Sequence, residues 1–435
     1  MVLLLIVILM LHPPVFTLTQ ALTWFQTYGG RRYDSARALI QTTDGGYALA
    51  GTGTTSSYYG AEGSGFWLVK TDSNGITQWD QMYGEKGGGC AEALIQTTDG
   101  GYALAGGTSS YGTWSPDYWL VKTDSNGIMQ WNQTYGGDGS DSAWALIQTT
   151  DGGYALAGGT NSYDTWRPDY WLVKTDSNGI MQWNQTYGGE EVDFAFALIQ
   201  TTDGGYALAG WTTSYGAGKY DYWLVKTDSN GIMQWNQTYG GEEPDSAFAL
   251  IQTTDGGYAL AGETSSYGAG FFDCWLVKTD NNGIMQWNQT YGGWLGDSAQ
   301  ALIQTTDGGY ALAGWTSSYG AGGSDFWLVK TDSNGITQWN QTYGGEKSDS
   351  AWALIQTTDG GYALAGETSS YGAGEYDCWL VKTDGINFLI TVFRYLAIGL
   401  IGSSIGLLIS RPVYRRYNKR RQKRAISKAL MDNVN

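Results

Sequence analysis

Seven tryptophans and 25 carboxylates stand in the parts of this 435-residue chain that differ between its internal copies. A tryptophan ring stacks on sugar rings or holds a cationic group, and a carboxylate accepts hydrogen bonds from hydroxyls or pairs with that cation. These residue types, beside only seven basic residues in the same segments, favour a ligand-binding surface. The alternative is that the tryptophans fill gaps and the acids keep the surface soluble. The candidate ligand-binding residues are Trp114, Trp144, Trp166, Trp211, Trp294, Trp315 and Trp352.

The composition excludes several kinds of catalysis. The single histidine, His12, lies in the N-terminal leader, and the three cysteines, Cys90, Cys274 and Cys378, are scattered. Hydrolysis by a histidine-activated nucleophile and histidine-based metal chemistry are therefore excluded, and neither a disulfide framework nor a zinc site is predicted. Pairs of carboxylates would suffice for glycoside hydrolysis. No copy has an acid pair of its own, however, so we predict no catalytic residues.

The aspartates of the repeats do not predict a metal site. Each copy contains a turn such as Asp124-Ser125-Asn126-Gly127, and so short a turn cannot supply the six to eight oxygen ligands that calcium prefers. These aspartates are interpreted as turn formers, and no cofactor is expected. A calcium ion remains an alternative on two groups of acids, which are Glu190, Glu191 and Asp193, and Glu242, Glu243 and Asp245.

An internal repeat must position these side chains. Each copy reads as four short strands, which we call a, b, c and d. Typical sequences are Ala-Leu-Ile-Gln-Thr-Thr, Tyr-Ala-Leu-Ala-Gly, Trp-Leu-Val-Lys-Thr and Ile-Met-Gln-Trp-Asn-Gln-Thr-Tyr. Asp-Gly and Asn-Gly between them are hairpin chemistry, because glycine adopts positive φ without penalty. Four antiparallel strands in about 50 residues, repeated, predict the blades of a β-propeller. The phrase Asp-Gly-Gly-Tyr begins at Asp44, Asp99, Asp151, Asp203, Asp255, Asp307 and Asp359.

The position at which the copies begin predicts a closed ring. The first copy starts with a lone strand d at Trp24, and the last copy ends after strand c at Asp384. The N-terminal strand therefore supplies the edge that the final blade lacks. A ring leaves no exposed end, whereas an open solenoid needs polar caps at both ends. The predicted fold is all-β, a seven-bladed β-propeller over residues 22–385 that is closed by its N-terminal strand.

The repeats resemble those of secreted archaeal and bacterial surface proteins, in which Trp … Thr-Tyr-Gly-Gly … Asp-Gly-Gly-Tyr … Ala-Gly … Trp-Leu-Val-Lys recurs. The stretch from Lys122 through Gly127 to Trp131 is also similar to the repeats of quinoprotein-type propellers, whose tryptophan docks neighbouring blades. The resemblance spans Trp24 to Asp384. It implies a β-propeller but no particular activity, because propellers host many functions, and no catalytic residue is carried over from it.

Strand direction divides the loops between the two faces of the disc. The a–b and c–d turns lie on one face and hardly vary between copies, so we call it the constant face. The b–c loops and the d–a links between blades lie on the other face, which we call the variable face. Varied loops on a fixed frame are where recognition usually occurs. All seven candidate tryptophans fall in these loops and links or in the first residues of strand a, so we expect them at the variable face.

Both ends of the chain carry membrane signals. Residues 1–21 contain a short apolar run typical of a signal peptide, with an uncleaved anchor as the alternative. Residues 386–410 are apolar apart from Arg394 and long enough to cross a bilayer of about 30 Å as a helix. The basic tail, residues 411–435, is predicted to lie in the cytoplasm and the propeller outside the cell.

The charge and two short motifs bear on partners. The chain before residue 386 carries 14 basic and 40 acidic residues, and so acidic a body repels phosphate backbones, which excludes nucleic acid as an expected partner. Gly402 and Gly406 form one GxxxG pair, which leaves dimerisation through the membrane helix open. Five strand-d sequons are candidate glycosylation sites, unless the tripeptide was simply copied with the repeat. They begin at Asn132, Asn184, Asn236, Asn288 and Asn340.

These observations predict a membrane-anchored module of the cell surface that binds a glycan or a protein through its variable face and catalyses no reaction. Two alternatives remain open. One is an extracellular enzyme, either a carboxylate-based glycoside hydrolase or a quinoprotein-like dehydrogenase. The other is a structural component of the cell envelope.

Overall fold

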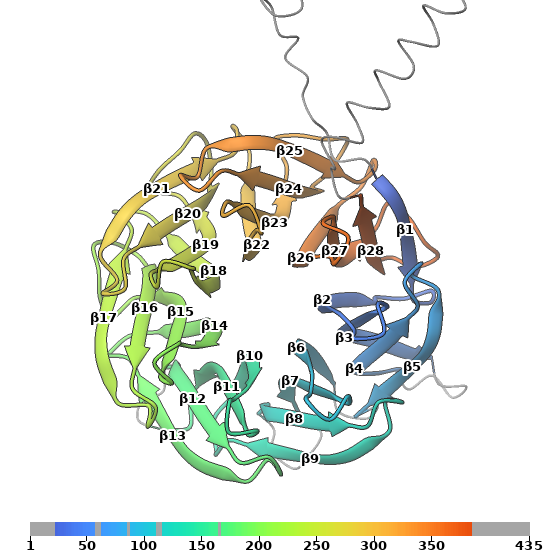
Figure 1. Cartoon of the computed structure of the whole chain (residues 1–435), viewed down its shortest axis with the longest axis horizontal. Helices are drawn as coiled ribbons and strands as arrows, with labels where there is room; N and C mark the ends of the chain where they lie inside the picture. The colour runs from blue at the N-terminus through green and yellow to red at the C-terminus, as the bar shows by residue number, and fades with distance from the viewer. Residues whose placement is uncertain (1–21, 57–61, 85–87, 110–114, 164–166, 385–435) are drawn as a thin grey trace, which may run out of the picture. The chain divides into compact units, whose positions relative to one another are not determined.

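Twenty-eight β-strands form seven four-stranded antiparallel sheets in the computed structural model, which describes residues 22–56, 62–84, 88–109, 115–163 and 167–384 (Figure 1). The sheets stand around a common axis as the blades of a propeller. The predicted all-β, seven-bladed propeller is thereby confirmed. Within the described ranges, no helix is long and apolar enough to cross a membrane. The predicted leader (1–21), membrane helix (386–410) and basic tail (411–435) lie outside those ranges.

Strands a to d of each blade follow one another from the axis outward (Figure 1). Blade 1 contains β2 (Ser35–Gln41), β3 (Tyr47–Ser56), β4 (Glu62–Thr71) and β5 (Thr77–Tyr83), and blade 2 contains β6 (Gly89–Gln96), β7 (Tyr102–Thr108), β8 (Asp117–Thr123) and β9 (Met129–Tyr135). Blade 3 contains β10 (Asp141–Gln148), β11 (Tyr154–Thr160), β12 (Asp169–Thr175) and β13 (Met181–Tyr187), and blade 4 contains β14 (Asp193–Gln200), β15 (Tyr206–Thr212), β16 (Asp221–Thr227) and β17 (Met233–Tyr239). Blade 5 contains β18 (Asp245–Gln252), β19 (Tyr258–Thr264), β20 (Asp273–Thr279) and β21 (Met285–Tyr291), and blade 6 contains β22 (Asp297–Gln304), β23 (Tyr310–Thr316), β24 (Asp325–Thr331) and β25 (Thr337–Tyr343). Blade 7 contains β26 (Asp349–Gln356), β27 (Tyr362–Thr368), β28 (Asp377–Thr383) and, as its outer strand, β1 (Leu22–Tyr28).

The turn aspartates shape the hairpins of the constant face. In blade 4, Asp228 Oδ1 accepts hydrogen bonds from Asn230 N (2.8 Å) and Ile232 N (2.9 Å), while Gly231 adopts φ +77°. In the a–b turn, Asp203 Oδ1 accepts one from Gly205 N (3.0 Å). The aspartates therefore act as turn formers, as the sequence indicates.

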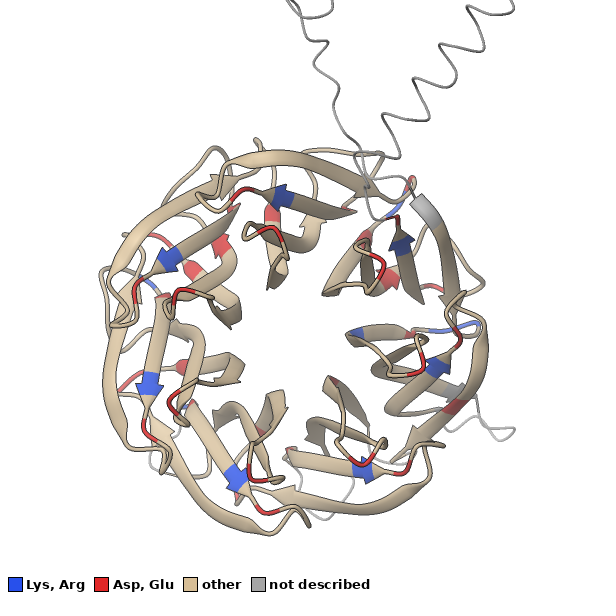
Figure 2. Ribbon diagram, viewed as in Figure 1, with Lys and Arg blue, Asp and Glu red and all other residues tan. Residues whose placement is uncertain are grey.

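In each blade, a buried lysine of strand c forms an ion pair with the aspartate of the a–b turn. Lys226 Nζ donates to Asp203 Oδ2 (2.8 Å), Thr227 O (2.7 Å) and Gln234 Oε1 (3.1 Å). Its side chain is only 4% exposed, so these acceptors replace the water that a buried ammonium group loses. Figure 2 shows a basic residue in the third strand of each blade beside an acidic turn.

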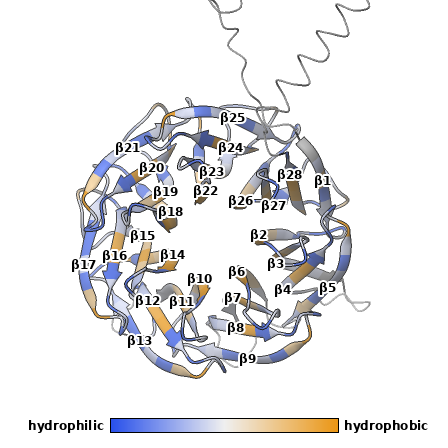
Figure 3. Ribbon diagram, viewed as in Figure 1, coloured by the Kyte–Doolittle hydropathy of each residue, from blue (hydrophilic) through white to orange (hydrophobic). Residues whose placement is uncertain are grey.

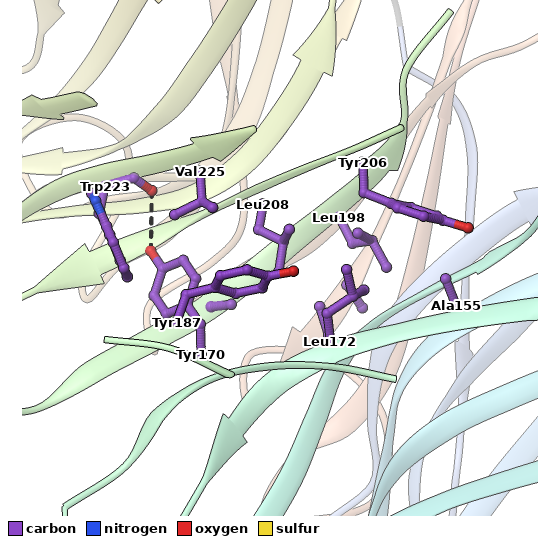
Figure 4. Close-up of a cluster of buried hydrophobic side chains, with 12 residues drawn as sticks. Ala155, Tyr170, Leu172, Tyr187, Leu198, Tyr206, Leu208, Trp223 and Val225 are labelled. Atoms are coloured by element: carbon purple, nitrogen blue, oxygen red, sulfur yellow. Dashed lines mark hydrogen bonds between the residues drawn. The ribbon is translucent and has the colours of Figure 1, made fainter. Parts of the chain in front are cut away.

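The hydrophobic core lies between blades rather than within them. One cluster joins Tyr170, Leu172 and Tyr187 of blade 3 to Leu208 and Trp223 of blade 4 (Figure 4). Six further clusters of the same kind join the other neighbouring blades, including blade 7 to blade 1. Apolar residues are concentrated in the three inner strands of each blade, and the outer strand is more hydrophilic (Figure 3). Each blade thus depends on both neighbours for burial of its faces.

The outermost strand of each blade docks on the next blade through an aromatic pair. The Trp183 ring lies 5.7 Å from the Tyr206 ring, edge to face, and covers the position that a Cβ at Gly231 would need. Tyr187 Oη donates to the carbonyl oxygen of the same glycine (2.6 Å). All seven junctions have the Trp–Tyr pair, at 5.7–5.9 Å between ring centroids. This contact requires glycine in the c–d turn.

The N-terminal strand closes the ring, as predicted. β1 pairs antiparallel with β28, with Tyr28 opposite Cys378, and Tyr28 Oη donates to Gly75 O of blade 1 (2.8 Å). At the constant face, a threonine N–H of each blade donates to a glutamine side chain of the next, at 2.9–3.1 Å. Thr358 N completes that circle on Gln41 Oε1 (3.0 Å).

Pairs of aspartates from neighbouring blades face each other at the variable face. Between blades 4 and 5, the buried Asp245 Oδ2 accepts from Gly241 N (2.9 Å) and Ser266 Oγ (2.7 Å), and the buried Asp221 Oδ2 accepts from Ala217 N (2.6 Å). A Cβ at Gly240 would collide with both carboxylates, so the two groups are close neighbours. Equivalent pairs are Asp117–Asp141, Asp169–Asp193, Asp273–Asp297, Asp325–Asp349 and Asp377–Asp34.

Deletion of residues 22–30 tests the closure. The open edge of β28 and the lost Trp24–Tyr47 and Tyr28–Gly75 contacts should lower the melting temperature by about 10 °C or more and promote association through the exposed edge. Thermal unfolding and light scattering measure the two effects. A permuted chain that carries residues 22–30 after Asp384, joined by an Asp-Ser-Asn-Gly turn, should recover both properties. A truncated protein that melts like the intact one and stays monomeric would contradict the ring.

The aspartate pairs predict how stability depends on pH. Burial raises the pKa of Asp221 against a hydrogen bond from Ala217 N, and the facing Asp245 adds to the rise. The folded state therefore keeps a proton that the unfolded chain has lost. The resulting penalty grows as pH rises from the ordinary aspartate pKa through the raised value. Asp221→Asn, which resembles the protonated form, should raise the melting temperature by about 1–2 °C at neutral pH and leave it unchanged below about pH 4.

Asp203→Asn in the same blade is a control of opposite sign. Against the effect of burial, hydrogen bonds from Lys226 and Thr201 hold the pKa of Asp203 at about 2. Its stabilising effect is present above the ordinary aspartate pKa and is lost as pH falls toward 2. This variant should therefore melt at a lower temperature at neutral pH and match the parent near pH 2. A destabilised Asp221→Asn protein at neutral pH would contradict the pairing.

Candidate functional site in the central channel

A β-bulge in strand a of every blade carries the residue that differs most between blades. In β14 the register against β15 shifts between Ala195 and Ala197, so Phe196 has no partner across the ladder. A bulge of this kind turns a side chain out of the regular alternation. The other blades have the same shift within the same Ala-x-Ala sequence. The seven bulge residues are Arg37, Glu92, Trp144, Phe196, Phe248, Gln300 and Trp352.

All seven bulge residues line one cavity of about 440 Å³, together with Glu263 and Trp315 from the second strands of blades 5 and 6. Since the first strands are the innermost (Figure 1), this cavity is part of the central channel. The bulge lies in the half of strand a that follows the d–a link, so the cavity is near the variable face. The same position of the repeat thus contributes one side chain from every blade to the wall of the cavity.

Aromatic side chains form one arc of this wall. Trp144 meets Phe196 edge to face, with ring centroids 5.1 Å apart, and Phe196 meets Phe248 at 5.3 Å. Phe194 extends the cluster and stacks on Trp211 at 6.3 Å. The rings hold one another in place, and their remaining surface faces the cavity. Such a wall suits a flat apolar or cationic group.

Charged side chains form the opposite arc. The Arg37 guanidinium lies 3.9 Å from the centre of the Trp352 ring. Glu92 is half-buried in the channel wall. Burial raises the pKa of its carboxyl, and the positive charge of Arg37 acts in the opposite direction. Glu367, which is not one of the residues that line the cavity, lies close enough to Arg37 for electrostatic attraction and accepts a hydrogen bond from Tyr33 Oη (2.6 Å). The charge of Arg37 is therefore compensated by carboxylates of the protein itself.

Glu263 is a further half-buried carboxylate in the cavity. Burial raises the pKa of the Glu263 carboxyl, and a hydrogen bond with the Ser298 side chain lowers it in part. Gln300 Nε2 in turn donates to Ser298 Oγ (2.8 Å). The two blade 6 residues thus orient an acid of blade 5.

A second cavity opens beside the channel on the variable face. It has a volume of about 520 Å³ and is lined by Leu295, the b–c loop of blade 6 and the serines of the next link. Trp315 lines both cavities. A ligand that contacts Trp315 can therefore extend from the channel onto the variable face.

The structure places the candidate tryptophans in three settings. Trp144 and Trp352 line the channel and Trp315 its opening, whereas Trp211 packs on Tyr220 at 5.2 Å. Trp294 is 82% exposed in the link before blade 6. Trp114 and Trp166 fall outside the described residues. The five tryptophans that the structure describes therefore do not form a single open surface.

Many acids of the variable segments are structural. Twelve of those 25 carboxylates belong to the aspartate pairs between blades. In the groups considered for calcium, Asp193 accepts from Ser214 Oγ (2.7 Å), Glu191 pairs with Arg167, and Glu243 pairs with Lys219 (2.7 Å). In the described part of the chain, no three acidic, histidine or cysteine side chains are placed to share a metal ion.

The sequon asparagines have a structural role. Asn236 Oδ1 accepts a hydrogen bond from Trp223 Nε1 (3.1 Å), and the same bond recurs at the other four sequons. In blade 1, Asp80 accepts the bond from Trp67 instead (3.0 Å). This contact explains why an acceptor recurs in strand d, and glycosylation stays a prediction.

Sequence reasoning missed most of the channel wall. Arg37, Glu92, Phe196, Phe248 and Gln300 were not among the candidates, although each stands between two invariant alanines. The signal was the position of strand a that varies most, set between two constant alanines. Its meaning depends on the bulge, which the sequence pattern does not reveal.

No family model matches this sequence, and no curated protein does. Among solved structures, the S511A mutant of puromycin hydrolase complexed with PGG is 12% identical over 82% of this chain and 54% of its own, with a TM-score of 0.49. BBS1N in complex with ARL6DN is 9% identical over 85% and 97%, with a TM-score of 0.47. The alpha-L-arabinanase of Penicillium chrysogenum complexed with arabinobiose is 12% identical over 67% and 92%, with a TM-score of 0.44. These likenesses concern the fold alone and do not distinguish an enzyme from a binding protein.

Proposed function

We propose that this chain is a membrane-anchored module of the cell surface that binds a glycan or a protein at the variable-face end of its central channel. The observation that supports the proposal is the convergence of seven divergent residues on one cavity. Between the flanking alanines, which are the same in every blade, the bulge position holds arginine, glutamate, glutamine, phenylalanine or tryptophan. A position that served only the fold would have been copied with the rest of the strand.

The cavity is suited to binding because its wall is firm and chemically mixed. The aromatic arc is packed edge to face, and Ser298 and Gln300 hold Glu263 in position. Pre-ordered side chains lose little entropy when a ligand arrives. The ring closure and the junction pairs keep the blades, and hence the seven wall residues, in register.

Glycoside hydrolysis is the second candidate function. Glu92 and Glu263 line the same cavity from blades 2 and 5, and burial raises the pKa of both carboxyls. A hydrolase needs one protonated acid and one ionised carboxylate across the bond that breaks. Cleavage of a bound glycan that is lost in both Glu92→Gln and Glu263→Gln would favour this candidate over simple binding.

Trp315 offers a sharp test of the site, because glycine occupies its repeat position in blades 2 and 3 as Gly107 and Gly159. Trp315→Gly should therefore fold normally. A ligand is first identified on glycan or surface-protein arrays. Loss of the stacked ring should then lower the affinity for that ligand at least tenfold. Titration of the propeller, residues 22–384, measures the effect, since every described strand and core cluster lies within that range.

Ser229→Ala on the constant face of blade 4 is the control and should leave affinity unchanged. Melting curves of both variants separate binding from folding. Unchanged affinity in Trp315→Gly, combined with loss of affinity in Ser229→Ala, would refute the assignment. A large fall in the melting temperature of Trp315→Gly would instead support a packing role for this tryptophan.

The proposed topology has its own test. The basic residues after 410 predict that the tail stays in the cytoplasm. Protease added to intact cells should remove the propeller and spare an epitope tag placed after Asn435. Loss of the tag while the cells stay sealed would show that the orientation is the reverse of the one proposed.

A further inference from the structure

The central channel contains one complete arrangement of tryptophan, glutamate and arginine. In blades 7 and 1, the Arg37 guanidinium lies 3.9 Å from the centre of the Trp352 ring, and Glu367 contributes an attractive charge. Glu367 is fixed by a hydrogen bond from Tyr33 Oη (2.6 Å). A planar guanidinium on an indole face beside a carboxylate combines cation–π attraction with charge pairing.

In the neighbouring blades 5 and 6, an aromatic ring and a glutamate occur at the same repeat positions, as Phe248 and Glu263, and Gln300 occupies the position of the arginine. Glu263 occupies in blade 5 the repeat position that Glu367 occupies in blade 7, opposite Cys274 as Glu367 is opposite Cys378. Trp315 and Phe248 line the cavity with it. No basic side chain contributes to the electrostatics of Glu263 within the described residues, and Ser298 is its hydrogen-bond partner. A half-buried carboxylate among aromatic rings is a favourable place for a cationic group.

We propose that Glu263, Trp315 and Phe248 form a subsite for the guanidinium group of an arginine side chain that a protein ligand inserts into the channel. The inference rests on the proposed binding function and narrows its ligand from a glycan or a protein to a protein with an exposed arginine. A cavity of about 440 Å³ admits one long side chain. The aromatic arc covers its aliphatic stem while the carboxylate pairs with its charge.

The test compares two small probes on residues 22–384. Acetyl-arginine methylamide should bind with a Kd on the order of 1 mM, as expected for a ligand of this size. Acetyl-citrulline methylamide, which has the same shape but no charge, should bind at least tenfold more weakly. Glu263→Gln should lower the affinity for the arginine probe at least tenfold, and so should Glu263→Thr, which copies Thr52 of blade 1. Calorimetry or tryptophan fluorescence measures each affinity.

Glu367→Gln is the matched control, because it removes a carboxylate from the same repeat position where Arg37 already supplies the cation. It should change the affinity less than twofold. Equal binding of the two probes, or equal losses in Glu263→Gln and Glu367→Gln, would overturn the subsite. Glucosamine binding that depends on Glu263 and exceeds arginine binding would overturn the protein ligand. A natural ligand lost in Trp315→Gly but retained in Glu263→Gln would refute this inference and leave the proposed function standing.

Discussion

Burial between blades is the constraint on which this structure depends. Each sheet has two apolar faces, and each core cluster is shared by two neighbouring blades. A blade with a missing neighbour would expose one of these faces, so the array is stable only as a closed circle. Trp24 and Tyr28 of the first strand dock on blade 1 from the edge of blade 7 and complete the last shared layer. The seven-fold frame follows from that requirement.

Closure also explains why so few positions vary between blades. The lysine–aspartate contacts, the Trp–Tyr pairs and the threonine–glutamine circle must recur in nearly every blade, which leaves little room for variation on the constant face. The bulge in strand a is different because its side chain leaves the ladder and points into the channel. Blades can differ there without disturbing the strand ladder, and neighbouring bulge residues pack on one another in the channel. The channel wall is accordingly asymmetric, with an aromatic arc from Trp144 to Phe248 and a charged arc around Arg37.

Periodicity and strand order were enough to predict the blades, their number and their closure, because these depend on recurring turns and on where the copies begin. The site was less predictable. Trp144 and Trp352 were placed near the variable face but line the channel, since the bulge redirects them inward. The acids of the same segments suggested a binding surface, yet Asp221, Asp245 and their counterparts face each other where two blades meet. The bulge depends on the register between strands a and b, and the aspartate pairs depend on how neighbouring blades meet. A one-dimensional pattern contains neither.

Hydrogen–deuterium exchange with a bound ligand tests directly whether the bulge residues of all seven blades form one binding site. A ligand retained by residues 22–384 should slow exchange in the d–a links and in the first halves of β2, β6, β10, β14, β18, β22 and β26, together with the end of β23 that carries Trp315. Exchange in the Asp-Gly-Gly turns and the outer strands should not change. Protection confined to the constant-face turns or to the outer strands would contradict the account.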